Sequence, residues 1–83
     1  MANLARNTKQ IGALIRRERK RRKMTQGDLG VVTGLRQETI SLIENGSPST
    51  KIETLLSVIG ALDLELRVEE RSKTQSSDIE SIF

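Results

Sequence analysis

The sequence predicts an all-α domain of four or five helices, followed by one C-terminal β-strand that pairs across a homodimer. Two observations carry this prediction. Apolar residues recur at helical spacing in four segments between residues 8 and 62, and capping or turn residues separate these segments. After residue 63, apolar and polar residues alternate strictly, which is typical of a strand with one buried face.

The first helix is expected to begin at Asn7 or Thr8, since either side chain can cap it, and to run to about Arg22. Three apolar residues share one face of this helix: Ile11, Leu14 and Ile15.

The second helix is expected to be short. Thr25 with Asp28 three residues later is close to a capping box, and Leu29 and Val32 are the apolar positions that follow. Gly34 ends the helix, because glycine adopts a left-handed conformation without a steric penalty. A third helix over 36–44 follows after a tight turn, with Leu35, Ile40 and Ile43 as its apolar residues.

A turn over 45–48 separates this helix from a fourth, for which Thr50 and Glu53 form the pattern of a capping box. Five residues are expected to face inward from the fourth helix: Ile52, Leu55, Leu56, Ile59 and Leu62.

The alternating segment over 64–70 places Leu64, Leu66 and Val68 on one face of a strand. A single strand finds no partner within this chain, so we expect it to pair with its copy in a symmetric dimer. The alternative is that Leu64 and Leu66 extend the last helix into the core. Three units result: a helical domain over 1–63, a dimerisation strand over 64–70 and a flexible tail over 71–83.

The polar tail ends in apolar residues, Ile79, Ile82 and Phe83. These residues form a possible partner-binding motif, and an ordinary frayed terminus is the alternative.

Composition excludes several classes of protein. Because the chain has no Cys and no His, we expect no disulfide, no Cys/His metal site and no thiol or histidine catalyst. The sequence also shows no carboxylate pair, nucleophile–base set or phosphate-binding loop, so we expect no cofactor and no enzymatic activity. No apolar stretch is long enough for a membrane span and the N-terminus lacks a signal-peptide pattern, so a cytoplasmic protein without a membrane partner is expected.

The charge is uneven along the chain. Residues 1–48 hold ten Lys or Arg against four Asp or Glu, a net charge of +6, whereas residues 49–83 carry −3. Most of the positive charge lies in the run 16–23. A basic half suggests a polyanionic partner, and a solvated helix face is the alternative.

Two short helices joined by a tight turn, beside a basic segment, form a helix-turn-helix arrangement, which binds double-stranded DNA through its second helix. Residues 11–62 resemble the Cro/C1-type (XRE-like) helix-turn-helix family, and the stretch MTQGDLGVVTGLRQETISLIENG over 24–46 carries the resemblance. Gly30 departs from the family, which usually has Ala there, at a helix cost of about 1 kcal/mol that close packing would offset.

The resemblance assigns roles to individual residues. The candidates for contact with base edges are Arg36, Gln37, Glu38 and Ser41, of which Gln37 is suited to adenine. The candidates for contact with phosphates are Lys20, Arg22, Lys23, Thr25, Gln26 and Thr39. Arg19 and Glu44 occupy the positions of a structural ion pair in the family. Plain solvent exposure is the alternative for each of the polar side chains.

The strand and tail narrow the resemblance to the HipB antitoxins of HipBA-type toxin–antitoxin modules. This resemblance implies a homodimeric repressor that binds a palindromic operator of its own operon and also holds a kinase-like toxin, HipA. Two alternatives stay open: a stand-alone phage-type repressor or restriction–modification controller, and a protein-interaction adaptor that does not bind DNA.

Overall fold

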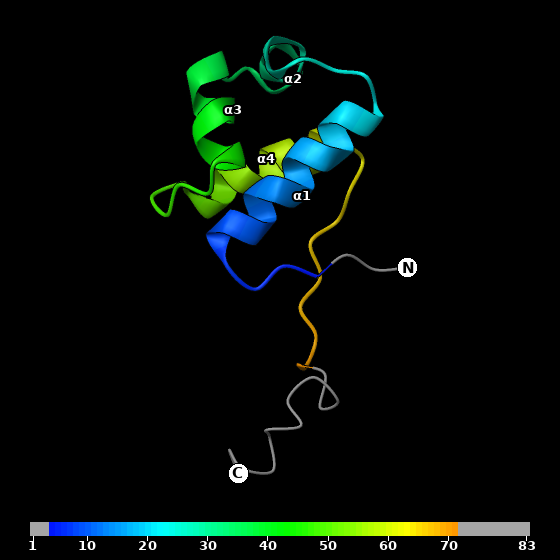
Figure 1. Cartoon of the computed structure of the whole chain (residues 1–83), viewed down its shortest axis with the longest axis vertical. Helices are drawn as coiled ribbons and strands as arrows, with labels where there is room; N and C mark the ends of the chain where they lie inside the picture. The colour runs from blue at the N-terminus through cyan, green and yellow to red at the C-terminus, as the bar shows by residue number, and fades with distance from the viewer. Residues whose placement is uncertain (1–3, 72–83) are drawn as a thin grey trace.

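The computed structural model describes residues 4–71, and within that range the chain forms four α-helices (Figure 1). They are α1 (Thr8–Arg21), α2 (Gln26–Thr33), α3 (Gln37–Glu44) and α4 (Ile52–Ala61). Helix α3 packs against both α1 and α2, and α2 also packs against α4. The expected all-helical domain is confirmed, and no helix in the described range is long and apolar enough to cross a membrane.

A small aliphatic core holds the four helices together. Every helix, together with the residue that caps α4, contributes to it: Ile15, Leu29, Ile40, Ile43, Val58 and Leu62. Full burial of each such side chain stabilises the fold by about 1.5–3 kcal/mol.

The sequence prediction was right about Leu55, Ile59 and Leu62 on the inward face of α4 and wrong about Ile52 and Leu56, as well as about one position of α2. Ile52 and Val32 are largely exposed and Leu56 is nearly half exposed, whereas Val58 is fully buried. Helical spacing fits both 52–55–56–59 and 55–58–59–62, so periodicity alone could not choose between the two faces. Packing of α4 on α2 selects the second one.

Side-chain caps start the first two helices. The Asn7 side chain accepts a hydrogen bond from the Gln10 backbone N–H at 2.8 Å. Thr25 and Asp28 form the expected capping box, with both bonds at 2.9 Å. The capping box expected for α4 is absent, because this helix begins one residue later than predicted and its N-cap is Lys51, which makes no side-chain cap bond.

All four helices end in the same way. Each is followed by a residue with φ between 58° and 84°, in the left-handed region: Lys23, Gly34, Gly46 and Asp63. The next backbone N–H in each case donates to the carbonyl five residues earlier, as in Met24 to Arg19 at 3.2 Å and Leu64 to Ile59 at 3.0 Å. Three of the residues that donate these bonds also pack against the core: Met24, Leu35 and Leu64.

Two glycines allow backbones to approach closely. A methyl group at Gly12 would collide with the carbonyl oxygens of Ile43 and Glu44, so α1 and α3 are in direct backbone contact there. A methyl group at Gly30 would lie 2.6 Å from the Leu35 carbonyl oxygen. Close packing therefore accounts for glycine at position 30.

Residues 64–71 form neither helix nor strand in the single chain. Helix α4 ends at Ala61 and Asp63 turns the chain, so the alternative that Leu64 and Leu66 extend this helix is wrong. Leu64 packs against the core, but Leu66 is half exposed and Val68 is 95% exposed. Strand pairing with a second copy stays a prediction, and the apolar tail residues Ile79, Ile82 and Phe83 lie outside the described residues.

Candidate nucleic-acid interface

Four polar side chains from two helices line one shallow depression, here called the recognition depression: Gln26, Gln37, Glu38 and Ser41. Gln26 is the first residue of α2, and the other three lie on the first two turns of α3. Gln37 and Glu38 are exposed, because the opposite side of α3 buries Ile40 and Ile43. The start of α3 therefore presents hydrogen-bonding groups to solvent beside the N-terminus of α2.

Two other candidates, Arg36 and Thr39, do not line the recognition depression. Arg36 is the exposed N-cap residue of α3, and its side chain makes no cap bond. Thr39 is half-buried and is not among the residues that line the depression. Glu38 lies in the first turn of α3, where a carboxylate also stabilises the helix dipole.

A buried ion pair fixes the two helices relative to α1. Arg19 donates to Glu44 from Nε at 2.6 Å and from Nη2 at 3.0 Å, and it also donates from Nη1 to the Met24 carbonyl at 2.7 Å. Glu44 accepts a further bond from the Gln26 amide at 3.1 Å. One ion pair thus joins α1, the turn before α2, the start of α2 and the end of α3.

The environment of Glu44 keeps it charged. Burial raises the pKa of its carboxyl, but hydrogen bonds from Arg19 and Gln26, with the positive charges of Arg19 and Arg16, outweigh burial and lower the pKa below its ordinary value. The bond from Gln26 uses one of its two amide hydrogens, so the other stays available for a phosphate.

Glu18 holds part of the basic run. Its carboxylate accepts bonds from Arg21 Nη2 at 2.8 Å and Arg22 Nη1 at 2.7 Å, and these bonds lower the pKa of Glu18. The side chain of Glu18 is buried beneath the two guanidinium groups, and that of Arg22 is only partly exposed. Arg22, a candidate for phosphate contact, uses its Nη1 within the chain and keeps the hydrogens of Nε and Nη2.

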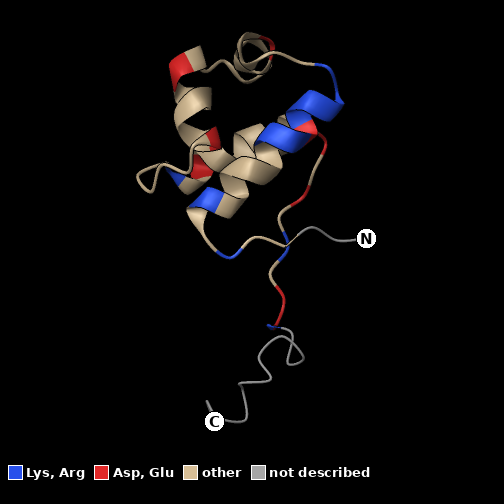
Figure 2. Cartoon of the chain, in the orientation of Figure 1, with Lys and Arg blue, Asp and Glu red and all other residues tan. Residues whose placement is uncertain are grey.

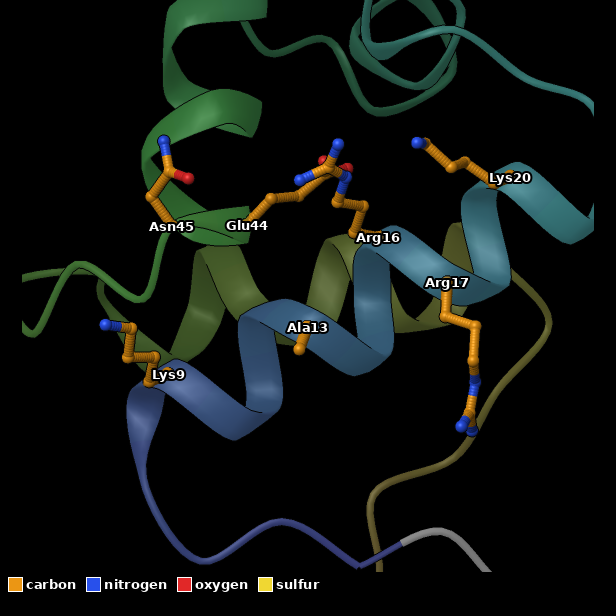
Figure 3. A pocket seen from close by; sticks show the side chains of 7 residues that line it. All are labelled: Lys9, Ala13, Arg16, Arg17, Lys20, Glu44 and Asn45. Atoms are coloured by element: carbon orange, nitrogen blue, oxygen red, sulfur yellow. The ribbon is translucent and has the colours of Figure 1, made fainter.

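A second hollow lies between α1 and the end of α3, as Figure 3 shows. Its lining residues are Lys9, Ala13, Arg16, Arg17, Lys20, Glu44 and Asn45. The side chains of Arg16 and Lys20 extend to the side on which Glu44 and Asn45 lie, and Arg17 turns away from them (Figure 3). Positive charge is concentrated on the second half of α1 (Figure 2).

Sequence reasoning selected Gln26, Gln37, Glu38 and Ser41, and the structure brings these four together. It missed Lys9 and Asn45, which line the second hollow, and it placed Arg16 in the basic run but not among the residues selected for phosphate contact. The signal was present in the sequence, because positions 9, 13, 16 and 20 share one face of a helix.

Comparison with known proteins supports this fold. Residues 15–68 match a family model described as helix-turn-helix. No curated protein matches the sequence. Among solved structures, a HipB variant in complex with the O2 20mer is similar at a TM-score of 0.80 and 22% identity, covering 87% of this chain and 100% of that chain.

Two further structures have a TM-score of 0.79 and 22% identity over 86% of this chain and 100% of theirs: one described as MDT Protein and one as a HipA–HipB–O2–O3 complex. At this level of identity, the likeness to these structures establishes the fold.

Proposed function

Because the chain belongs to the helix-turn-helix family, we propose that it is a sequence-specific DNA-binding repressor that acts as a homodimer on a palindromic operator. The observation that carries this proposal is the recognition depression. A helix-turn-helix domain places the second helix of its pair, here α3, in the major groove with its early residues toward the bases. Three such residues of α3, Gln37, Glu38 and Ser41, line the depression, and Gln26 of α2 completes it.

The proposed contacts follow from position and chemistry. Gln37 pairs its amide with adenine, and Arg36, Glu38 and Ser41 reach neighbouring base edges. Thr25, Gln26, Thr39, Lys20 and Lys23 contact phosphates. Arg22 also contacts a phosphate, through the Nε and Nη2 hydrogens that its bonds to Glu18 leave unused.

We further propose that the protein is the antitoxin of a HipA-type toxin–antitoxin module and represses its own operon. Its support is the fold that it shares with HipB in the structures above, one of which also contains HipA. In this proposal residues 1–63 bind DNA, residues 64–70 join two copies as a strand pair, and residues 71–83 offer Ile79, Ile82 and Phe83 to the kinase-like toxin.

The DNA-binding proposal is tested by selecting duplexes from a randomised pool and measuring affinity for the selected duplex and a scrambled one. We expect a palindromic selected site and an affinity that falls steeply with salt. A flat salt response would instead favour an interaction adaptor.

Gln37→Ala is expected to cost about 1–3 kcal/mol on the selected duplex and to relax one base position. The scrambled duplex is the control, because its binding should not change. Equal losses on both duplexes would show that Gln37 does not read sequence.

The antitoxin proposal is tested by co-purification of the full chain with the kinase-like protein encoded beside it. Removal of residues 72–83 should weaken this association and leave DNA binding unchanged. If no such protein is encoded nearby, or none binds, a stand-alone repressor is the better interpretation.

A further inference from the structure

We propose that α1 carries a second DNA-contact surface, which holds one stretch of sugar–phosphate backbone of the duplex that α3 reads. This surface, here called the phosphate groove, consists of Lys9, Arg16 and Lys20 on α1 and Asn45 at the end of α3 (Figure 3). The proposal rests on the proposed function and extends the contact surface to the first helix.

The groove has a defined shape. Lys9, Ala13, Arg16 and Lys20 lie along one face of α1, and the small side chain of Ala13 leaves room between the longer ones. The turn after α3 forms the other side. A methyl group at Gly46 would lie 2.7 Å from the Lys9 Cα, so the turn that follows Asn45 rests directly on the start of α1.

The groove also has unneutralised positive charge. Within residues 4–71, the side chains of Lys9, Arg16 and Lys20 form no salt bridge and donate no hydrogen bond to another residue. The one carboxylate that lines the groove, Glu44, is already paired with Arg19 at 2.6 Å. Three cations beside a compensated carboxylate form a site for a polyanion.

The groove adjoins the recognition depression. Glu44 lines the groove and accepts a hydrogen bond from Gln26, which lines the depression. A duplex seated on α3 therefore has its backbone close to α1, and phosphates along that backbone meet Lys20, Arg16 and Lys9 in turn. This arrangement favours DNA over an acidic protein as the occupant.

The same helix provides a contrasting set of cations. Arg21 and Arg22 lie within two residues of Lys20, but both are bonded to the Glu18 carboxylate. The basic run 16–23 thus contains cations that form no salt bridge within residues 4–71, Arg16 and Lys20, and cations that share the single negative charge of Glu18, Arg21 and Arg22. Replacement of the two sets should therefore change the salt dependence of DNA affinity to different extents.

The experiment measures affinity for the selected and scrambled duplexes over a range of salt concentrations. It compares the wild-type chain with the triple variant Lys9→Gln, Arg16→Gln, Lys20→Gln and with the double variant Arg21→Gln, Arg22→Gln. Each lost phosphate contact lowers the slope of log affinity against log salt by about 0.9. The triple variant should therefore lower the slope by roughly 2–3 per protomer, equally on both duplexes, because phosphate contacts carry no sequence information.

The double variant should change the slope by less than about 1, and circular dichroism melts establish that both variants are folded. Asn45→Asp, which adds one negative charge to the groove, should lower the affinity for both duplexes several-fold. Equal slope changes in the triple and double variants would overturn the proposal that the phosphate groove binds DNA. An unchanged slope in the triple variant would overturn it as well. Absence of salt-dependent DNA binding by the wild-type chain would instead overturn the proposed function itself.

Discussion

At the scale of single residues, the Arg19–Glu44 pair joins more of the fold than any other polar contact among the described residues. Both side chains are less than 10% exposed, so each charge depends on the other. A buried pair adds little net stability compared with apolar residues, but loss of one partner leaves a buried charge uncompensated. The main role of the pair is therefore to position two helices, because it holds the start of α2 against the end of α3.

We expect Glu44→Gln to lower the free energy of unfolding by about 3 kcal/mol, because the Arg19 guanidinium is left without its counter-charge. Urea unfolding measures this loss. The matched control is Glu69→Gln, which removes an exposed pair with Arg67 at 3.5 Å and should cost less than about 0.5 kcal/mol. Similar costs for the two variants would show that burial does not matter here.

The same variant should alter the pH dependence of stability. The lowered pKa of Glu44 means that its stabilisation is complete above its ordinary value of 4.5 and is lost as pH falls through the lowered pKa. Glu18 and Asp28, whose pKa values are also lowered, act in the same direction. Glu44→Gln should thus show a smaller loss of stability below pH 4.5 than the wild-type chain.

At the scale of helices, left-handed residues close every helix, but only two of the four are glycines. Lys23 and Asp63 adopt a conformation that costs an L-residue about 1–2 kcal/mol. The hydrogen bonds and apolar contacts of the residues that follow, Met24 and Leu64, compensate for this cost.

Asp63→Gly is expected to raise the free energy of unfolding by about 0.5–1 kcal/mol, because glycine removes the steric cost at this φ while increasing the entropy of the unfolded chain. Gly34→Ala should have the opposite sign and cost about 1 kcal/mol. No atom lies within 4 Å of a methyl group there, so the change isolates the backbone conformation. Thermal melts of both variants measure these changes in stability. Destabilisation by Asp63→Gly would show that the Asp63 carboxylate itself stabilises the fold.

Capping and turn residues in the sequence predicted the helices well. Contacts between helices decided the features that the sequence alone did not predict. The Thr25–Asp28 box and Gly34 are complete within a few residues, so the sequence alone located α2. The inward face of α4 depends on contact with α2, and two helical faces fitted the same pattern. Arg21 and Arg22 stand at i+3 and i+4 from Glu18, so helical spacing already indicates this pairing, which the sequence analysis did not draw.

At the scale of the whole molecule, the charge is divided unevenly along the chain. The first 48 residues contain the recognition depression and the phosphate groove and carry +6, and the remainder carries −3. Leu66 and Val68 are exposed on a segment that has no strand partner within the described chain. A second copy would supply one.

We expect Leu66→Asp or Val68→Asp to convert a dimer into monomers, because each places a charge where two strands are proposed to pair. Light scattering coupled to gel filtration measures the mass, and Arg67→Gln, on the opposite face of the alternating segment, is the control. Monomers of the two Asp variants should also lose preference for a palindrome with half-sites about one helical turn apart. A mass that stays dimeric in both would place the dimer interface elsewhere.

The backbone contact at Gly12 has a consequence for the proposed recognition of DNA sequence. Because α3 is seated by its carbonyl oxygens against α1 and by its buried residues Ile40 and Ile43, none of its exposed side chains is needed to hold it in place. The exposed positions 36, 37 and 38 can be exchanged without a change in the buried core, with Glu38 giving up only its interaction with the dipole of α3. Position 12, by contrast, admits no substitution, so sequence diversity among functional descendants would gather on the outward face of one short helix.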